Sequence, residues 1–196
     1  MTAFASSTAQ ATIPMSDLAS HYLEEISRQL RGHKRMAEAA IAQLEDKDFF
    51  ATLDPEGNSV AVIVKHMSGN ARSRFTDFLT SDGEKPDRKR DQEFVMTAAT
   101  SRDQLLGFWE QNWGLLFDTL NGLEAADLER TVTIRGEAHS VLQALNRAMG
   151  HCSYHVGQIT FLAKHWKGAE WKTLSVPKGQ SEQFNAKMAK KHGGRG

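Results

Sequence analysis

Apolar residues recur mostly four positions apart along several stretches of the chain, the spacing typical of amphipathic helices. A long first helix is predicted over residues 16–44. Its apolar positions are Leu18, Tyr22, Ile26, Leu30, Ala37, Ile41 and Leu44. The sequence DPEGN at residues 54–58 then indicates a turn, and the hydroxyl of Ser59 is placed to cap a second helix.

The second helix has a competing interpretation. Residues 60–64, VAVIV, are mostly β-branched, and local propensity alone assigns such a run to a buried strand. The apolar positions, however, continue at helical spacing well beyond the length of a strand. These positions are Val60, Val64, Met67, Ala71, Phe75 and Phe78. The pattern therefore predicts a helix over about 59–80 that is heavily buried in its first half.

The third and fourth helices have clear start signals. Ser101 and Gln104 have the spacing of a capping box, and the helix that follows is predicted to end near Gly122. Residues 131–136 favour a small extended arm or hairpin. Ser140 is placed to start the fourth helix directly after it.

These elements predict an all-α protein, an antiparallel four-helix bundle with a long connection between its second and third helices. Residues 81–91 of that connection are polar and charged, and we expect them to be exposed. Residues 1–14 are predicted to be a disordered extension and residues 15–186 to form the bundle, with a C-terminal tail that packs back on the helices. Residues 187–196 are expected to be a flexible basic tail.

Composition narrows the classes of partner. The chain has 196 residues, with 24 basic residues balancing 24 acidic ones. This balance argues against nucleic acid or an anionic membrane as partner and favours a small-molecule substrate. The single cysteine, Cys152, excludes an intramolecular disulfide framework and a cysteine-rich zinc site, and it predicts a cytoplasmic protein. Translation can begin at Met1 or at Met15, because the sequence after Met15 is also typical of a protein start.

Histidines supply the candidate chemistry. His151 and His155 are four residues apart on the fourth helix, so both imidazoles project from one face, which overlaps the apolar stripe. They are either core histidines hydrogen-bonded to carbonyls or carboxylates, or two ligands of one metal ion. His66 on the second helix is the best candidate for a third ligand, because facing helices of a bundle build such sites together. Three neutral imidazoles with an open fourth position suit zinc, nickel or iron(II).

Two segments resemble a known family. NSVAVIVKHMSGN at residues 58–70 and HCSYHVGQI at residues 151–159 resemble the DinB-like (YfiT-like) metal-binding four-helix bundles, and the resemblance covers nearly the whole chain. It implies that His66, His151 and His155 bind one divalent metal ion and that the protein is a homodimer. For His66 as a ligand, the resemblance carries more weight than the spacing.

Two further segments are similar to an uncharacterised bacterial branch of this superfamily. They are RKRDQEF at residues 88–94 and TLSVPKGQSEQFN at residues 173–185. Better-understood members of the superfamily include metal-dependent thiol transferases, which use low-molecular-weight thiols, and proteins assigned as metal-dependent hydrolases. No residue of this chain selects one of these chemistries, and the sequence identifies no catalytic residue.

Other polar residues near the histidines have two readings each. Asn70 follows His66 by one turn and Gln158 follows His155 by three residues, so both can orient the ligands or a substrate. Ordinary hydrogen bonds between helices explain these two residues equally well. Cys152 lies about 100° around the helix from His151, and we expect it to pack in the core.

The charged residues around the long connection also have two readings. Asp91 and Glu93 can supply a metal ligand or a general base if the connection folds over the bundle, and they are otherwise part of a solvated loop. Arg74, Arg88 and Arg90 can bind an anionic substrate or simply form a charged surface.

Three functions follow from these alternatives. The first is an enzyme whose metal activates a thiol or a water molecule. The second is a non-catalytic metal-binding or stress-related structural dimer, in which the histidines are closed off from solvent. The third is a partner-binding module without a metal.

Overall fold

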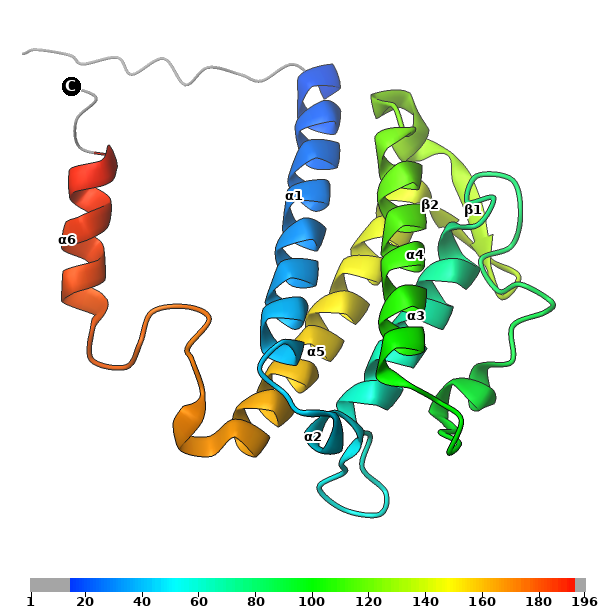
Figure 1. Cartoon of the computed structure of the whole chain (residues 1–196). Helices are drawn as coiled ribbons and strands as arrows, with labels where there is room; N and C mark the ends of the chain where they lie inside the picture. Colours follow the sequence, from blue (N-terminus) through cyan, green and yellow to red (C-terminus); the bar gives the residue numbers. More distant parts are fainter. Residues whose placement is uncertain (1–14, 193–196) are drawn as a thin grey trace, which may run out of the picture.

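The computed structural model describes residues 15–192 and is predominantly helical (Figure 1). Four long helices account for most of this part of the chain and share one apolar core. They are α1 (Met15–Ile41), α3 (Val60–Phe75), α4 (Arg102–Asn121) and α5 (Val141–Lys167). The expected all-α class is confirmed. The extension predicted at residues 1–14 and the last four residues of the predicted basic tail lie outside the described residues.

Capping serines start three of the four long helices. The Ser59 hydroxyl accepts a hydrogen bond from the Val62 amide, so α3 begins where the sequence predicts a helix and not a strand. All five residues of the β-branched run are buried, and packing in the core therefore outweighs their local preference for a strand. Ser101 and Ser140 form complete capping boxes at the starts of α4 and α5. Helix α3 ends at Phe75, five residues before the predicted end.

The helices pack as two pairs, α3 with α4 and α1 with α5, and within each pair the two helices run in the same direction. At the start of α4, Arg102 donates hydrogen bonds to the carbonyls of Ile41 and Leu44, beside the short helix α2 (Asp46–Phe50) that precedes α3. At the other end, Thr119 of α4 donates to the Phe75 carbonyl that ends α3. Helices α3 and α4 are therefore parallel (Figure 1). The expected antiparallel order is wrong for this pair, because the connection at 76–101 returns the chain along the whole length of α3.

Helices α1 and α5 are parallel by the same reasoning. The Tyr22 hydroxyl donates to the Asn146 side chain near the start of both helices. Beyond their ends, the Gln43 side-chain amide donates to the Lys172 carbonyl and accepts from the Lys172 amide. The pair α3 and α4 runs opposite to the pair α1 and α5, so helices of different pairs are antiparallel. It is this arrangement that sets α3 against α5.

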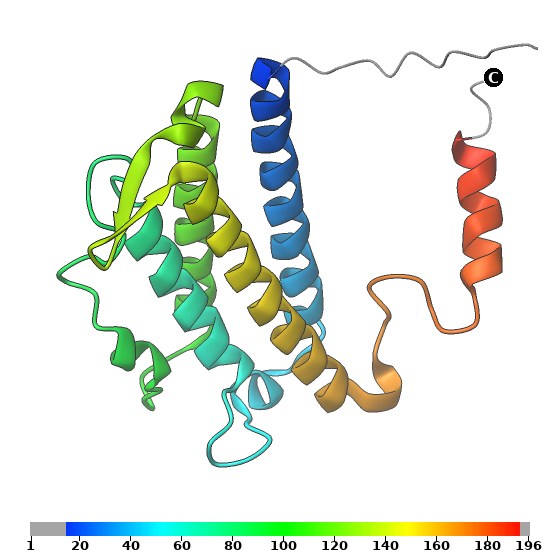
Figure 2. The same cartoon turned by 180° about the vertical axis from the view of Figure 1, so that it is seen from behind.

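A small hairpin closes one end of α3 and α5. Strands β1 (Thr131–Ile134) and β2 (Glu137–Ser140) are antiparallel, and Arg135 and Gly136 join them with φ values of 57° and 78°. Two consecutive positive φ values are typical of a type I′ turn, which suits a two-residue hairpin loop. The Gly83 amide donates to the Thr133 carbonyl, so the long connection is attached to the hairpin (Figure 2). The expected hairpin is confirmed.

The long connection is less exposed than its composition predicts. Gly83 is buried, and the Arg88 side chain is only 4% exposed. The 3-10 helix η1 (Arg90–Phe94) packs against α3, and its Glu93 is also buried. The expectation of an exposed segment at 81–91 is therefore wrong for Gly83 and Arg88, whereas Pro86, Asp87 and residues 89–91 are exposed as expected.

The C-terminal tail packs only in part. After the 3-10 helix η3 (Gly168–Glu170), Trp171 and Leu174 lie against the core. Helix α6 (Ser181–His192) stands apart from the four long helices in both views (Figures 1 and 2). Its large apolar residues are Phe184 and Met188, too few for a continuous apolar face. The expectation of a packed tail is thus wrong for α6. Among the described residues, no helix has both the length and the apolar character needed to span a bilayer.

The cap of α5 gives a test of how the local sequence stabilises the fold. Ser140→Ala removes the hydroxyl that accepts from the Gln143 amide, and we expect it to reduce the free energy of unfolding by about 1 kcal/mol. Urea denaturation measures this change. Ser140→Thr keeps a hydroxyl and should retain most of the stability. Equal stability of the alanine and threonine variants would show that the cap contributes nothing.

Candidate metal centre

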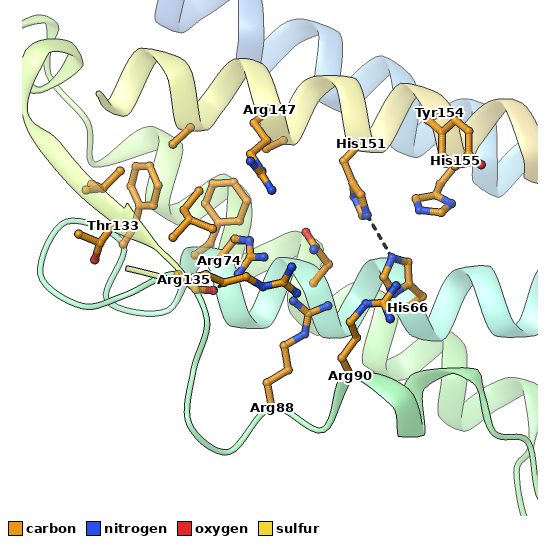
Figure 3. Close-up of a pocket in the computed structure, with 18 of the residues that line it drawn as sticks. His66, Arg74, Arg88, Arg90, Thr133, Arg135, Arg147, His151, Tyr154 and His155 are labelled. Atoms are coloured by element: carbon orange, nitrogen blue, oxygen red, sulfur yellow. Dashed lines mark hydrogen bonds between the residues drawn. The ribbon is translucent and has the colours of Figure 1, made fainter. Parts of the chain in front are cut away.

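Three histidines from two helices meet between α3 and α5. One nitrogen of each of His66, His151 and His155 lies within 4.8 Å of the corresponding nitrogens of the other two (Figure 3). The Nε2 atoms of His66 and His151 are 3.1 Å apart. The structure thus brings together all three histidines that the sequence singled out. For comparison, tetrahedral coordination with metal–nitrogen bonds of about 2.05 Å separates two ligand nitrogens by about 3.3 Å.

The direction of the helices explains this meeting. His66 lies near the middle of α3, and His151 and His155 lie on one face of α5, one turn apart. Because α3 and α5 run in opposite directions, His66 and the residues that follow it on α3 face His155 and the residues that precede it on α5. The three imidazole centroids are 4.5–5.2 Å from one another.

Glu93 fixes the orientation of His66. The Glu93 Oε2 atom is 2.8 Å from His66 Nδ1, and both side chains are buried. Arg88 donates to both carboxylate oxygens of Glu93, at 2.9 and 3.1 Å. Burial alone would raise the Glu93 pKa, but the hydrogen bonds from His66 and Arg88 hold that pKa below its usual value. An ionised carboxylate only accepts hydrogen bonds, so Nδ1 carries a proton, and Nε2 is the nitrogen that faces the other two histidines.

Gln158 has the corresponding role for His155. The Gln158 Oε1 atom lies 2.7 Å from His155 Nδ1, so this amide oxygen accepts a hydrogen bond from Nδ1–H, and in the neutral ring Nε2 is then unprotonated. Asn70, the other residue expected to orient the ligands, lines a cavity beside the triad.

The electrostatics keep His151 and His155 neutral. Burial, together with the nearby His155, His66 and arginine side chains, lowers the pKa of His151 to about 3. Burial also lowers the His155 pKa. Neutral imidazole is the form that binds a metal ion. A set of three neutral nitrogen donors fits zinc, nickel or iron(II), and these residues leave a fourth position for another group.

A cavity of about 430 Å³ opens onto the triad and extends along α3 and α5 to the hairpin. Arg74, Arg88 and Arg90, the arginines that the sequence singled out, all line it. Arg135 and Arg147 line it too, although sequence reasoning missed both. For Arg147 a signal exists, because it precedes His151 by one helical turn.

The two carboxylates of the connection have different environments. Glu93 contacts His66 and Arg88, whereas the Asp91 side chain is 95% exposed and lies 3.6 Å from Arg90. Asp91 is therefore not part of the triad's surroundings. Cys152 is buried in the core, as expected, and burial raises the pKa of its thiol to about 12.

A family model described as "Protein of unknown function (DUF1572)" matches residues 17–180. The chain belongs to this DUF1572 family. The match covers the four long helices, the connection and the hairpin, and it ends just before α6. No curated protein matches the chain. Membership of DUF1572 thus confirms the resemblance at the level of an uncharacterised family, whose description names no activity.

Gly69 gives a test of the Glu93 contact in this DUF1572 protein. A Cβ atom at Gly69 would lie 2.4 Å from Glu93 Oε1, closer than real Cβ contacts. Gly69→Ala should therefore displace Glu93 from His66. We expect the buried His66 Nδ1 proton to give a proton NMR signal in the wild type and to lose that signal in Gly69→Ala. Gly107→Ala is the matched control, because a Cβ there meets no atom within 4 Å. An unchanged His66 resonance in Gly69→Ala would contradict the contact.

Proposed function

We propose that this protein is a DinB-like four-helix bundle that binds one divalent metal ion through His66, His151 and His155, and that it is an enzyme activating a thiol or a water molecule. The observation that carries the proposal is the convergence of three imidazoles at one end of a cavity. A divalent ion at this position stabilises the anionic form of a bound nucleophile. The cavity provides the space for a small-molecule substrate beside it.

The protein residues around the triad divide into two groups. Glu93 and Gln158 hold the Nδ1 protons of His66 and His155, which directs the Nε2 lone pairs toward one point. The residues of the cavity bind and orient the substrate next to that point. The open side of the triad disfavours the alternative of a purely structural metal site, which would be closed by a fourth protein ligand.

The surroundings favour a thiol over water as the nucleophile. Water activation commonly uses a carboxylate as general base, yet among the described residues none that lines the cavity is Asp or Glu. The nearest carboxylate, Glu93, is already bonded to His66 and Arg88. A thiol needs less help, because its pKa of about 8.5 is close to neutral pH and a nearby cation lowers it further. We therefore favour a low-molecular-weight thiol as the nucleophile. We further propose that the enzyme is a homodimer and acts in the cytoplasm.

Metal content is the first test. Protein purified without chelator should contain about one equivalent of zinc, nickel or iron by elemental analysis, and a chelator should lower its melting temperature because the ion binds only the native state. The double variant His151→Ala, His155→Ala should lose both the metal and the response to chelator. His21→Ala, His165→Ala is the control, because both histidines are exposed and lie outside the triad. Wild-type metal content in the first double variant would overturn the proposal.

Activity is the second test. We expect metal-loaded protein to conjugate a low-molecular-weight thiol to a simple electrophile, in a screen that also includes ester and amide substrates and zinc, nickel, manganese and iron. His151→Ala should abolish this activity. Cys152→Ala should keep it, because the buried thiol at this position is not the nucleophile. Hydrolysis without conjugation would reassign the nucleophile to water, and neither reaction with any metal would contradict an enzymatic role.

A further inference from the structure

The charged residues that line the cavity have one sign. Five arginines face it, from α3, the long connection, the hairpin and α5, and among the described residues no Asp, Glu or Lys lines it. The chain as a whole carries as many acidic as basic residues. The positive charge is thus concentrated in one concave region, although the chain as a whole is balanced.

Three of these arginines share one carboxylate. Arg74, Arg88 and Arg135 lie 2.9, 3.2 and 3.3 Å from the same oxygen of Glu84. One carboxylate neutralises only one of the three charges. Arg88 also forms an ion pair with a second carboxylate, that of Glu93. These contacts hold the guanidinium groups of Arg74 and Arg88, whose side chains are 11% and 4% exposed, in place, whereas Arg135 is half exposed; together they leave a surplus of positive charge. Such preorganised groups bind an oxyanion without the entropy cost of ordering flexible side chains.

Arg147 is the fourth arginine of this cluster and differs from the other three. It projects from α5 toward Arg74 and Arg135 across the cavity (Figure 3). Within residues 15–192, no ion pair or hydrogen bond is found for its guanidinium group. Arg90 lies beyond, stacked at 5.0 Å on the Phe94 ring and weakly paired with the exposed Asp91. Arg147 therefore keeps its full hydrogen-bonding capacity for a ligand.

The arginines and the histidines occupy different levels of the same two helices. On α5, Arg147 precedes His151 by four residues, and on α3, Arg74 follows His66 by eight. Four residues correspond to a rise of about 6 Å, so the arginine level lies roughly one to two turns from the triad. Farther toward the hairpin, the cavity is lined by apolar residues. These residues are Phe75, Phe78, Val132 and Ile134.

We propose that the cavity binds a small organic acid whose carboxylate or phosphate group is held by Arg147 together with Arg74 and Arg135, with an apolar substituent against Phe75 and Phe78. The anion site stands on the arginine cluster alone. Its role as part of a substrate site rests on the proposed function, since the part of the ligand that faces the triad is then the part that reacts.

Binding of matched ligands tests this proposal on the protein as purified. We expect 3-phenylpropionate and phenyl phosphate to bind measurably by isothermal titration calorimetry, and 3-phenylpropanol, of similar shape but neutral, to bind at least about tenfold more weakly. Affinity should fall as ionic strength rises. The ratio of the two acids tells whether the site prefers carboxylate or phosphate. Equal binding of an acid and the alcohol would overturn the proposal.

Variants then locate the anion. Arg147→Gln should weaken binding of the preferred acid by about 10- to 100-fold, and Arg147→Lys should keep part of the affinity because the charge remains. Arg28→Gln is the control, since Arg28 is an exposed arginine of α1 that is paired with Glu25. A normal melting temperature of Arg147→Gln confirms that it is folded. Wild-type affinity in Arg147→Gln would overturn the proposal.

The double variant His151→Ala, His155→Ala separates this inference from the proposed function. If the acid still binds to this variant while the metal is lost, the anion site is independent of the triad, as proposed. If the histidine variant loses acid binding while Arg147→Gln keeps it, the acid binds at the triad and the inference is wrong. Absence of metal from the wild type combined with binding that depends on Arg147 would refute the proposed function and leave the anion site intact.

Discussion

The hydrogen bond between His66 and Glu93 is the contact on which the site depends. It joins α3 to the long connection, and the buried Arg88 side chain links Glu93 to the partly exposed Glu84 in a chain of alternating charges. A buried charge without a partner is expensive, so the members of such a chain require one another. The connection must therefore fold onto α3 in one arrangement. Gly69 makes the close approach possible, because a side chain there would occupy the position of the carboxylate.

This one constraint also explains the shape of the cavity. Once Glu93 and Arg88 are held against α3, the residues before them lie along the same helix and the hairpin is attached to them through Gly83 and Thr133. The cavity is then enclosed by α3, α5, the connection and the hairpin. The result is a set of neutral imidazoles beside a concentration of positive charge. Both features favour an anionic ligand next to a bound cation, and neither requires the rest of the surface to be charged.

Local signals made part of this structure predictable. The caps at Ser59, Ser101 and Ser140 and the turn at Arg135 and Gly136 depend on neighbouring residues only, and each is found where the sequence places it. The pair His151 and His155 follows from helical geometry. Interactions across the chain were harder to predict. The parallel directions of α3 and α4 and the contact of Glu93 with His66 both depend on a connection without periodicity, and nothing in the local sequence distinguishes Glu93 from Asp91 two residues earlier.

The β1–β2 hairpin is the part of the cavity wall whose sequence can change most easily, because its turn is exposed. The triad is carried by two long helices that also form the core, so a change in their register would disturb the whole fold. The hairpin contributes Thr133, Ile134 and Arg135 to the far end of the same cavity, yet its turn is exposed and its connections are short. Exposed turns tolerate substitution and insertion far better than packed helices do. Ligand preference can therefore diverge among relatives through the hairpin while the histidines stay unchanged.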